Sequence, residues 1–184
     1  MLHIVMDSAG DLPDSWQEQY QIQLVPINIH FKEQTFYQGV DLSNADFYRL
    51  ARESGVIPKT SQPSPQQFID FYRRIARPGD SILSIHITGK LSGTLASAEM
   101  AARELAGELA VHAYDSACGS AGMGFMCREA RLMERAGQSL EAILARLDQV
   151  RREMRVILTL NTLEFARRSG RVKALQAALA SLLN

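Results

Sequence analysis

Short strand-like runs alternate with helix-like segments along this 184-residue chain. Such alternation favours an α/β fold in which a largely parallel sheet is flanked by helices. The segment 32–37 is a candidate for a short antiparallel arm beside that sheet. The expected strands are Leu2–Met6, Leu24–Phe31, Ser81–Ile87, Val111–Tyr114 and Arg155–Leu160.

Serine residues mark the expected helix starts. Ser43 and Ser139 each precede apolar residues at helical spacing, so both are predicted to be N-caps. Residues 64–67 (Ser-Pro-Gln-Gln) have the form of a capping box with proline at the first helical position. Ser92 precedes a further helical pattern and is another N-cap candidate.

Three of the predicted strands end in polar, glycine-containing turns. The strand 2–6 runs into Asp7-Ser8, the strand 111–114 into Asp115-Ser116, and the strand 81–87 into the loop 88–94. Ligands of open α/β sheets bind at the carboxyl ends of the strands. We therefore expect a ligand at this edge, with the two aspartates bracing their turns rather than binding metal.

The charge balance excludes several classes of partner. Lys and Arg total 20, as do Asp and Glu, so no basic field would attract nucleic acid or an anionic membrane. The N-terminus lacks the features of a signal peptide, and no apolar stretch is long enough for membrane insertion. We expect a cytoplasmic protein in which Cys118 and Cys127 are reduced thiols outside any metal motif.

Two loops are rich in hydroxyl groups. The loop 60–65 reads Thr-Ser-Gln-Pro-Ser-Pro, and the loop 88–94 reads Thr-Gly-Lys-Leu-Ser-Gly-Thr. Each lies where an extended run gives way to a helix. Hydroxyls, backbone N–H groups and helix N-termini together suit a carboxylate or a phosphate. With few charged side chains nearby in sequence, the pattern favours capture of an oxyanion over catalysis.

Other interpretations of these residues stay open. Ser92 is explained about equally well as a helix cap. An enzymatic alternative makes Ser92 the nucleophile and His86 the base of a phosphoryl- or acyl-transfer reaction, which requires the two within hydrogen-bond reach. Arg171 either reaches a ligand anion or lies at a helix end. Because no nucleophile elbow, metal triad or dinucleotide fingerprint occurs, no catalytic residue, metal site or cofactor is predicted.

A series of motifs resembles the DegV family of bacterial fatty-acid-binding proteins. The resemblance runs essentially from end to end of the chain. It implies two α/β domains with a long-chain fatty acid buried between or beside them. In chain order the motifs are Asp7-Ser8, Thr60-Ser61-Gln62-Pro63-Ser64, Leu91-Ser92-Gly93-Thr94, Asp115-Ser116 and Ser169-Gly170-Arg171-Val172.

The resemblance also implies how the ligand is held and used. The fatty-acid-binding residues would be Thr60, Ser61, Ser92, Gly93, Thr94 and Arg171. The family includes subunits of bacterial fatty acid kinase, which present the bound carboxylate to a separate ATP-dependent kinase protein. The expected function is therefore non-catalytic binding of a fatty acid. The tail would supply most of the affinity, at about 0.8 kcal/mol per buried CH₂.

The C-terminal segment is expected to differ from the rest of the chain. Residues 1–154 would form the N-terminal domain, and residues 155–184 would begin a second α/β domain that this sequence does not complete. The run 174–183 is almost entirely apolar, a pattern that predicts burial on most sides. Since chains of the family continue further, a third interpretation is a truncated remnant that folds without holding a ligand.

Overall fold

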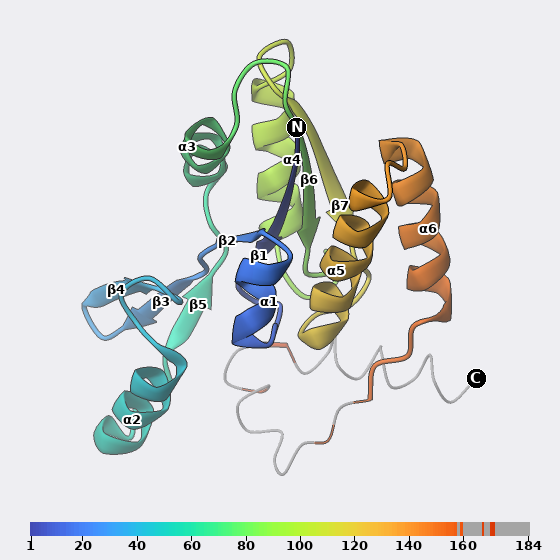
Figure 1. Ribbon diagram of the computed structural model, residues 1–184. Coiled ribbons are helices and arrows are strands. Elements are labelled where there is room, and N and C mark those ends of the chain that lie inside the picture. The colour runs from blue at the N-terminus through green and yellow to red at the C-terminus, as the bar shows by residue number, and fades with distance from the viewer. Residues whose placement is uncertain (158, 160–166, 168–169, 172–184) are drawn as a thin grey trace.

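The computed structural model describes residues 1–157, 159, 167, 170 and 171. Its centre is a parallel sheet of four strands in the order β2-β1-β6-β7 (Figure 1). The predicted α/β class with a parallel sheet is confirmed. These strands are β1 (Leu2–Asp7), β2 (Ile22–Val25), β6 (Ser81–His86) and β7 (Ala110–Asp115).

Helices cover both faces of the sheet (Figure 1). On one face lie α3 (Pro65–Ile75) and α4 (Thr94–Glu104); on the other lie α1 (Asp14–Gln19), α5 (Ala121–Arg135) and α6 (Leu140–Glu153). Along each strand, alternate side chains enter opposite apolar cores. Ile4 and Met6 pack towards α5, whereas Val5 packs towards α3 and α4.

The serine N-caps form as predicted. The Ser43 hydroxyl accepts the N–H of Asp46, and the Ser139 hydroxyl accepts the N–H of Ala142. At Ser64 both halves of the capping box are present, and Pro65 occupies the first helical position. Each bond satisfies an N–H that the helix itself leaves unpaired.

A smaller antiparallel sheet extends from the core as an arm (Figure 1). It consists of β3 (Asn28–Phe31), β4 (Gln34–Tyr37) and β5 (Lys59–Ser61) in the order β4-β3-β5, and it carries α2 (Asn44–Ser54). The predicted antiparallel return over 32–37 is confirmed. The hydroxyl of Ser8 ties the arm to the end of β1, because it accepts the N–H of Ile27 at 2.8 Å and donates to Gln38 at 3.2 Å.

The predicted single strand Leu24–Phe31 is wrong. It divides into β2 in the parallel sheet and β3 in the arm. The break falls at Pro26, which has no N–H to donate to a ladder. Helix α1 was not predicted, because its sequence has no apolar stripe and it buries no residue.

The predicted last strand, Arg155–Leu160, does not form where the structure describes it. Arg155–Ile157 and Thr159 are irregular, and positions 158 and 160 lie outside the described residues. The predicted apolar run 174–183 also lies outside them, so the domain boundary at 154/155 stays a prediction. Within the described part of the chain, no helix is both long and apolar enough to cross a membrane.

Candidate functional site

Three turns meet at the carboxyl edge of the parallel sheet. Ser120, in the turn after β7, donates its hydroxyl to Asp11, in the turn after β1, at 2.6 Å. Ser116 donates its hydroxyl to the carbonyl of His86 at 2.7 Å, and the N–H of Thr88 reaches the carbonyl of Cys118 at 2.9 Å. The predicted clustering of these turns is confirmed. Many of their polar groups form hydrogen bonds from one turn to another.

A chain of buried hydrogen bonds links side chains of β1, β6 and α3 beneath this edge of the sheet. Nδ1 of His86 lies 3.0 Å from Oδ2 of Asp7, and Nε2 lies 2.8 Å from the hydroxyl of Ser84. The Tyr72 hydroxyl donates to Ser84 at 2.8 Å. Because Tyr72 donates, the Ser84 proton is free for Nε2, and the proton on Nδ1 then serves Asp7. Every member of this chain is fully buried.

These hydrogen bonds confirm the bracing role predicted for Asp7. The alternative in which His86 acts as a base for a Ser92 nucleophile is wrong. Asp7 accepts the N–H groups of Ala9 at 3.0 Å and Ile87 at 2.9 Å, which braces both turns as expected. His86 cannot act as a base for Ser92, since both its ring nitrogens are engaged elsewhere and no solvent reaches it. The sequence does not show which atoms lie within hydrogen-bond reach of His86, so its partners could be identified only in the structure.

The loop 60–65 joins the arm to α3 and is fixed at several points. Nε2 of His30 lies 2.7 Å from the hydroxyl of Ser61. The Asn28 amide donates to the carbonyl of Gln62 at 3.3 Å and exchanges hydrogen bonds with Gln67 at 3.3 and 3.1 Å. Asn28 and His30 were not predicted at this place, because they lie on a strand some thirty residues earlier in the sequence.

Thr60 and Arg171 line one pocket. Thr60 is exposed on β5, and its hydroxyl makes no hydrogen bond to any residue that the structure describes. The pocket beside it has a volume of about 650 Å³. Its other lining residues are Gly55, Val56, Ile57, Pro58, Lys59 and Gly170. The predicted site residues Thr60 and Arg171 thus come together around a largely apolar wall.

The loop 88–94 presents Ser92 at the start of α4. Its hydroxyl lies 2.8 Å from that of Thr94, which is fully buried. The predicted N-cap at Ser92 is wrong, because the cap position belongs to Gly93, which has no side chain to offer. Ser92 is half-buried one residue before the cap position, and its hydroxyl accepts the N–H of Thr94, the first residue of α4, at 3.3 Å.

The two hydroxyl-rich loops touch at one point. A Cβ atom placed on Gly93 would lie 2.8 Å from Nε2 and 3.1 Å from Cδ of Gln62. Real side chains do not tolerate such an approach, so the amide of Gln62 lies directly over the glycine. The structure thus brings Ser61 and Ser92 to the two sides of one contact, which joins the arm to the core.

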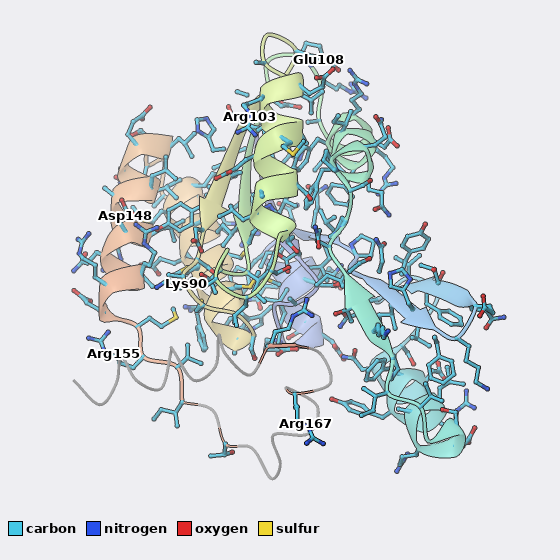
Figure 2. The ribbon with its side chains drawn as sticks, turned by 180° about the vertical axis from the view of Figure 1, so that it is seen from behind. Lys90, Arg103, Glu108, Asp148, Arg155 and Arg167 are labelled. Carbon is cyan, nitrogen blue, oxygen red and sulfur yellow. The ribbon has the colours of Figure 1, made fainter. Side chains whose placement is uncertain are left out.

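The other reactive side chains that the structure describes are two thiols and a lysine near the same edge of the sheet. The described residues contain no cluster of His, Cys, Asp or Glu able to hold a metal ion. Burial raises the pKa of the Cys118 thiol and, more strongly, the pKa of the Cys127 thiol, which keeps both protonated. Lys90 lies exposed on the loop before α4 (Figure 2).

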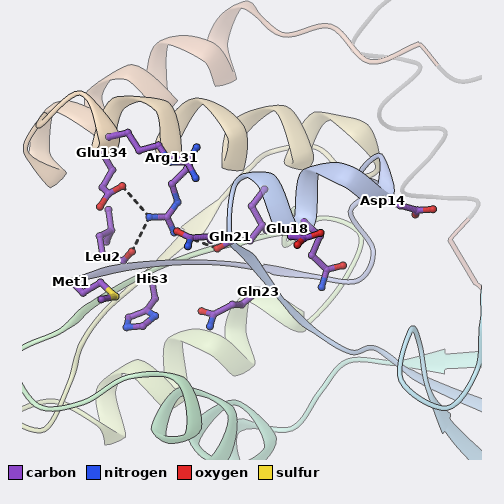
Figure 3. A pocket seen from close by; sticks show the side chains of 12 residues that line it. Met1, Leu2, His3, Asp14, Glu18, Gln21, Gln23, Arg131 and Glu134 are labelled. Carbon is purple, nitrogen blue, oxygen red and sulfur yellow. Dashed lines mark hydrogen bonds and ion pairs between the residues drawn. The ribbon is translucent and has the colours of Figure 1, made fainter.

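A larger pocket, of about 900 Å³, lies around the opposite end of the strands (Figure 3). Arg131 is buried in its wall and donates to the carbonyls of Tyr20, Leu2 and Gln21 at 2.9, 3.3 and 3.3 Å, and to Glu134 at 3.0 Å. Three of these hydrogen bonds fasten α5 to the start of β1 and to the residues just before β2, and the bond to Glu134 lies within α5. The pocket contains none of the predicted site residues.

Comparison with known proteins places this architecture in one family. A profile described as "Uncharacterised protein, DegV family" matches residues 1–184. A DegV domain-containing protein from Deinococcus radiodurans is 36% identical over 181 residues, which are 98% of this chain and 64% of that protein.

Two solved structures share the fold. One, described as fatty acid binding of a DegV family protein from Thermus thermophilus, has 38% identity and a TM-score of 0.82. The match covers 100% of this chain and 65% of that chain. The other is DegV, described as a fatty acid binding protein, from Bacillus subtilis. It has 27% identity and a TM-score of 0.88, with 97% of this chain covering 64% of that one. The chain thus spans slightly less than two thirds of these relatives.

Proposed function

Because this chain belongs to the DegV family, we propose that it binds a long-chain fatty acid without catalysing a reaction on it. The carboxylate would lie between the loops 60–65 and 88–94, held by Thr60, Ser61, Ser92 and the backbone at Gly93. The observation that carries this proposal is the contact of Gln62 with Gly93, which brings two hydroxyl-bearing loops from different sheets together.

The chemistry of the site suits a carboxylate. The start of α4 supplies backbone N–H groups and the positive end of the helix dipole, and hydroxyls supply further donors. Each hydrogen bond to a charged group contributes roughly 1.5–3 kcal/mol. Thr94 would act indirectly, because its buried hydroxyl holds Ser92.

The apolar tail needs a longer slot than the polar anchor. Val56, Ile57 and Pro58 line the pocket beside Thr60, and Arg171 lies at the same pocket. We place the first methylene groups along this wall, with Arg171 beside the carboxylate. Residues 155–184 would begin the second domain that completes the slot.

We further propose that the bound acid is presented to a separate ATP-dependent kinase protein in the cytoplasm. The protein would then act as a carrier, since the described residues offer neither a metal cluster nor an accessible base beside Ser92. Incubation of this protein with a bacterial fatty acid kinase catalytic protein, ATP and labelled oleate should yield acyl phosphate only when all four components are present. Acyl phosphate formed without the kinase protein would contradict the carrier role.

Binding itself is tested by titrating the purified chain with a fluorescent long-chain fatty acid. The double variant T60A/S92A should lose at least tenfold in affinity while keeping its circular dichroism spectrum. A matched control is S15A, which removes an exposed hydroxyl from α1, on the other face of the sheet from α4. Unchanged affinity in the double variant would refute the carboxylate assignment.

A further inference from the structure

The side chain of Gln62 is not needed to form its loop or to cap the helix that follows. Its side chain lies over Gly93, within 2.8 Å of the place that a Cβ would occupy. The amide is exposed, and among the described residues it has no hydrogen-bond partner. A flexible polar side chain therefore rests on the backbone that opens α4, with its donors unspent.

The backbone beneath this side chain is held firmly. The carbonyl of Gln62 accepts from Asn28, the next residue, Pro63, is buried, and the capping box follows at Ser64. Movement of the loop cannot easily carry the amide away from Gly93. The position of the amide is consequently set by rotation of the Gln62 side chain alone.

A primary amide suits the proposed ligand better than most side chains would. Its NH₂ group offers two donors to a carboxylate and carries no charge that would trap other anions. Gly93 lets it lie against the first turn of α4, the positive end of the helix dipole. An alanine at position 93 would push the amide outward.

We propose that Gln62 is a carboxylate-binding residue of this site, and that position 93 is glycine so that the Gln62 amide can reach the ligand. This inference rests on the proposed function. It adds a donor that bridges the arm and the core to the hydroxyl groups already assigned.

The first test compares a fatty acid with its methyl ester. Q62A should bind oleate about tenfold more weakly, while its affinity for methyl oleate stays within about twofold of wild type. Q62E should lose more oleate affinity than Q62A, because like charges repel. The control is Q66A, whose amide bonds to Asp70 on the exposed face of α3. Equal losses for acid and ester, or no loss, would overturn the assignment.

The second test uses the contact with Gly93. G93A should weaken oleate binding in the wild-type background, and should cost little more when Gln62 is already alanine, because the displaced group is then absent. A G93A penalty of the same size in both backgrounds would show that Gln62 is not involved.

Failure of this inference differs from failure of the proposed function. If T60A/S92A loses oleate and Q62A does not, the site stands and Gln62 lies outside it. If wild-type protein discriminates no better than T60A/S92A between oleate and methyl oleate, the carboxylate site itself is refuted, and Gln62 with it.

Discussion

The parallel-sheet core and the antiparallel arm are held together by different forces. In the core, side chains such as Ile4, Leu83 and Phe68 are fully buried between helices and strands. In the arm, α2 buries none of its residues, and Tyr48 is 65% exposed. The core is stabilised mainly by apolar burial, whereas the arm buries fewer apolar side chains, Ile29 and Phe31 among them, and depends also on hydrogen bonds such as those of Asn28 and His30.

This difference matters because the proposed site uses both parts. Thr60 and Ser61 belong to the arm, whereas Ser92 and Gly93 belong to the core. A ligand held by both would bridge a tightly packed region and a weakly packed one. Binding should then order the arm far more than the core.

The largest effect is expected from a cavity in the core. F68A should lower the free energy of unfolding by about 3–5 kcal/mol, because it removes a buried ring that packs on Tyr72 and His86. Y48A in the arm should change it by less than about 0.5 kcal/mol. Urea denaturation followed by circular dichroism measures both. Similar losses would mean that the arm and core share one apolar core.

A slightly smaller effect is expected at the buried polar chain. D7A should cost about 3 kcal/mol, because it leaves the Nδ1–H of His86 and the N–H of Ile87 without acceptors. The same denaturation experiment applies, with D11A as an aspartate control in the neighbouring turn. Wild-type stability in D7A would mean that water replaces the carboxylate without penalty.

The arm should respond locally rather than globally. N28A should lower the free energy of opening the arm by about 1–2 kcal/mol, since it removes the hydrogen bonds to Gln67 and to the carbonyl of Gln62. Hydrogen exchange should accelerate in β5 and leave β6 unchanged. N44A, at an exposed position of α2, is the control. Acceleration spread evenly over both sheets would contradict independent behaviour of the arm.

Ligand binding should sharpen the same contrast. Saturating oleate should slow hydrogen exchange in β5 and in the loop 60–65, with little change in β1 and β6, whose amides are already protected by the core. Mass spectrometry of peptic fragments resolves these segments. Slowing confined to the core would place the ligand elsewhere.

The smallest effect is expected on the loss of stability at low pH, through the carboxylate of Asp80. Hydrogen bonds from the Met1 ammonium, and then from the Arg77 N–H and His3, hold the pKa of Asp80 well below its ordinary value of 3.8. In the unfolded chain the pKa returns to that value. The stabilisation is therefore complete above about pH 4 and is lost as the pH falls below it. D80N should flatten this decline in thermal unfolding; the same decline in D80N would exclude the pair as its cause.

The sequence predicted the core better than the arm for a physical reason. Buried strands such as β1 carry runs of apolar residues, and caps such as Ser64 with Gln67 are local patterns, so both are visible in sequence. Pro26 is a local signal for the break between β2 and β3 that the prediction overlooked. The partners of Ser61 depend on residues distant along the chain. Motif order pointed to Thr60 and Ser92, but Gln62 became a candidate only when its side chain was seen over Gly93.

The buried chain of Ser84, His86 and Asp7 has a consequence for recognising enzymes by geometry. Its distances of 2.8 and 3.0 Å match those of the catalytic triad in a serine hydrolase. A template search based on interatomic distances would retrieve it, yet the Ser84 hydroxyl is buried away from solvent and accepts a hydrogen bond from Tyr72. A fluorophosphonate probe should leave Ser84 unlabelled. A triad therefore identifies a hydrolase only where a substrate can reach the serine.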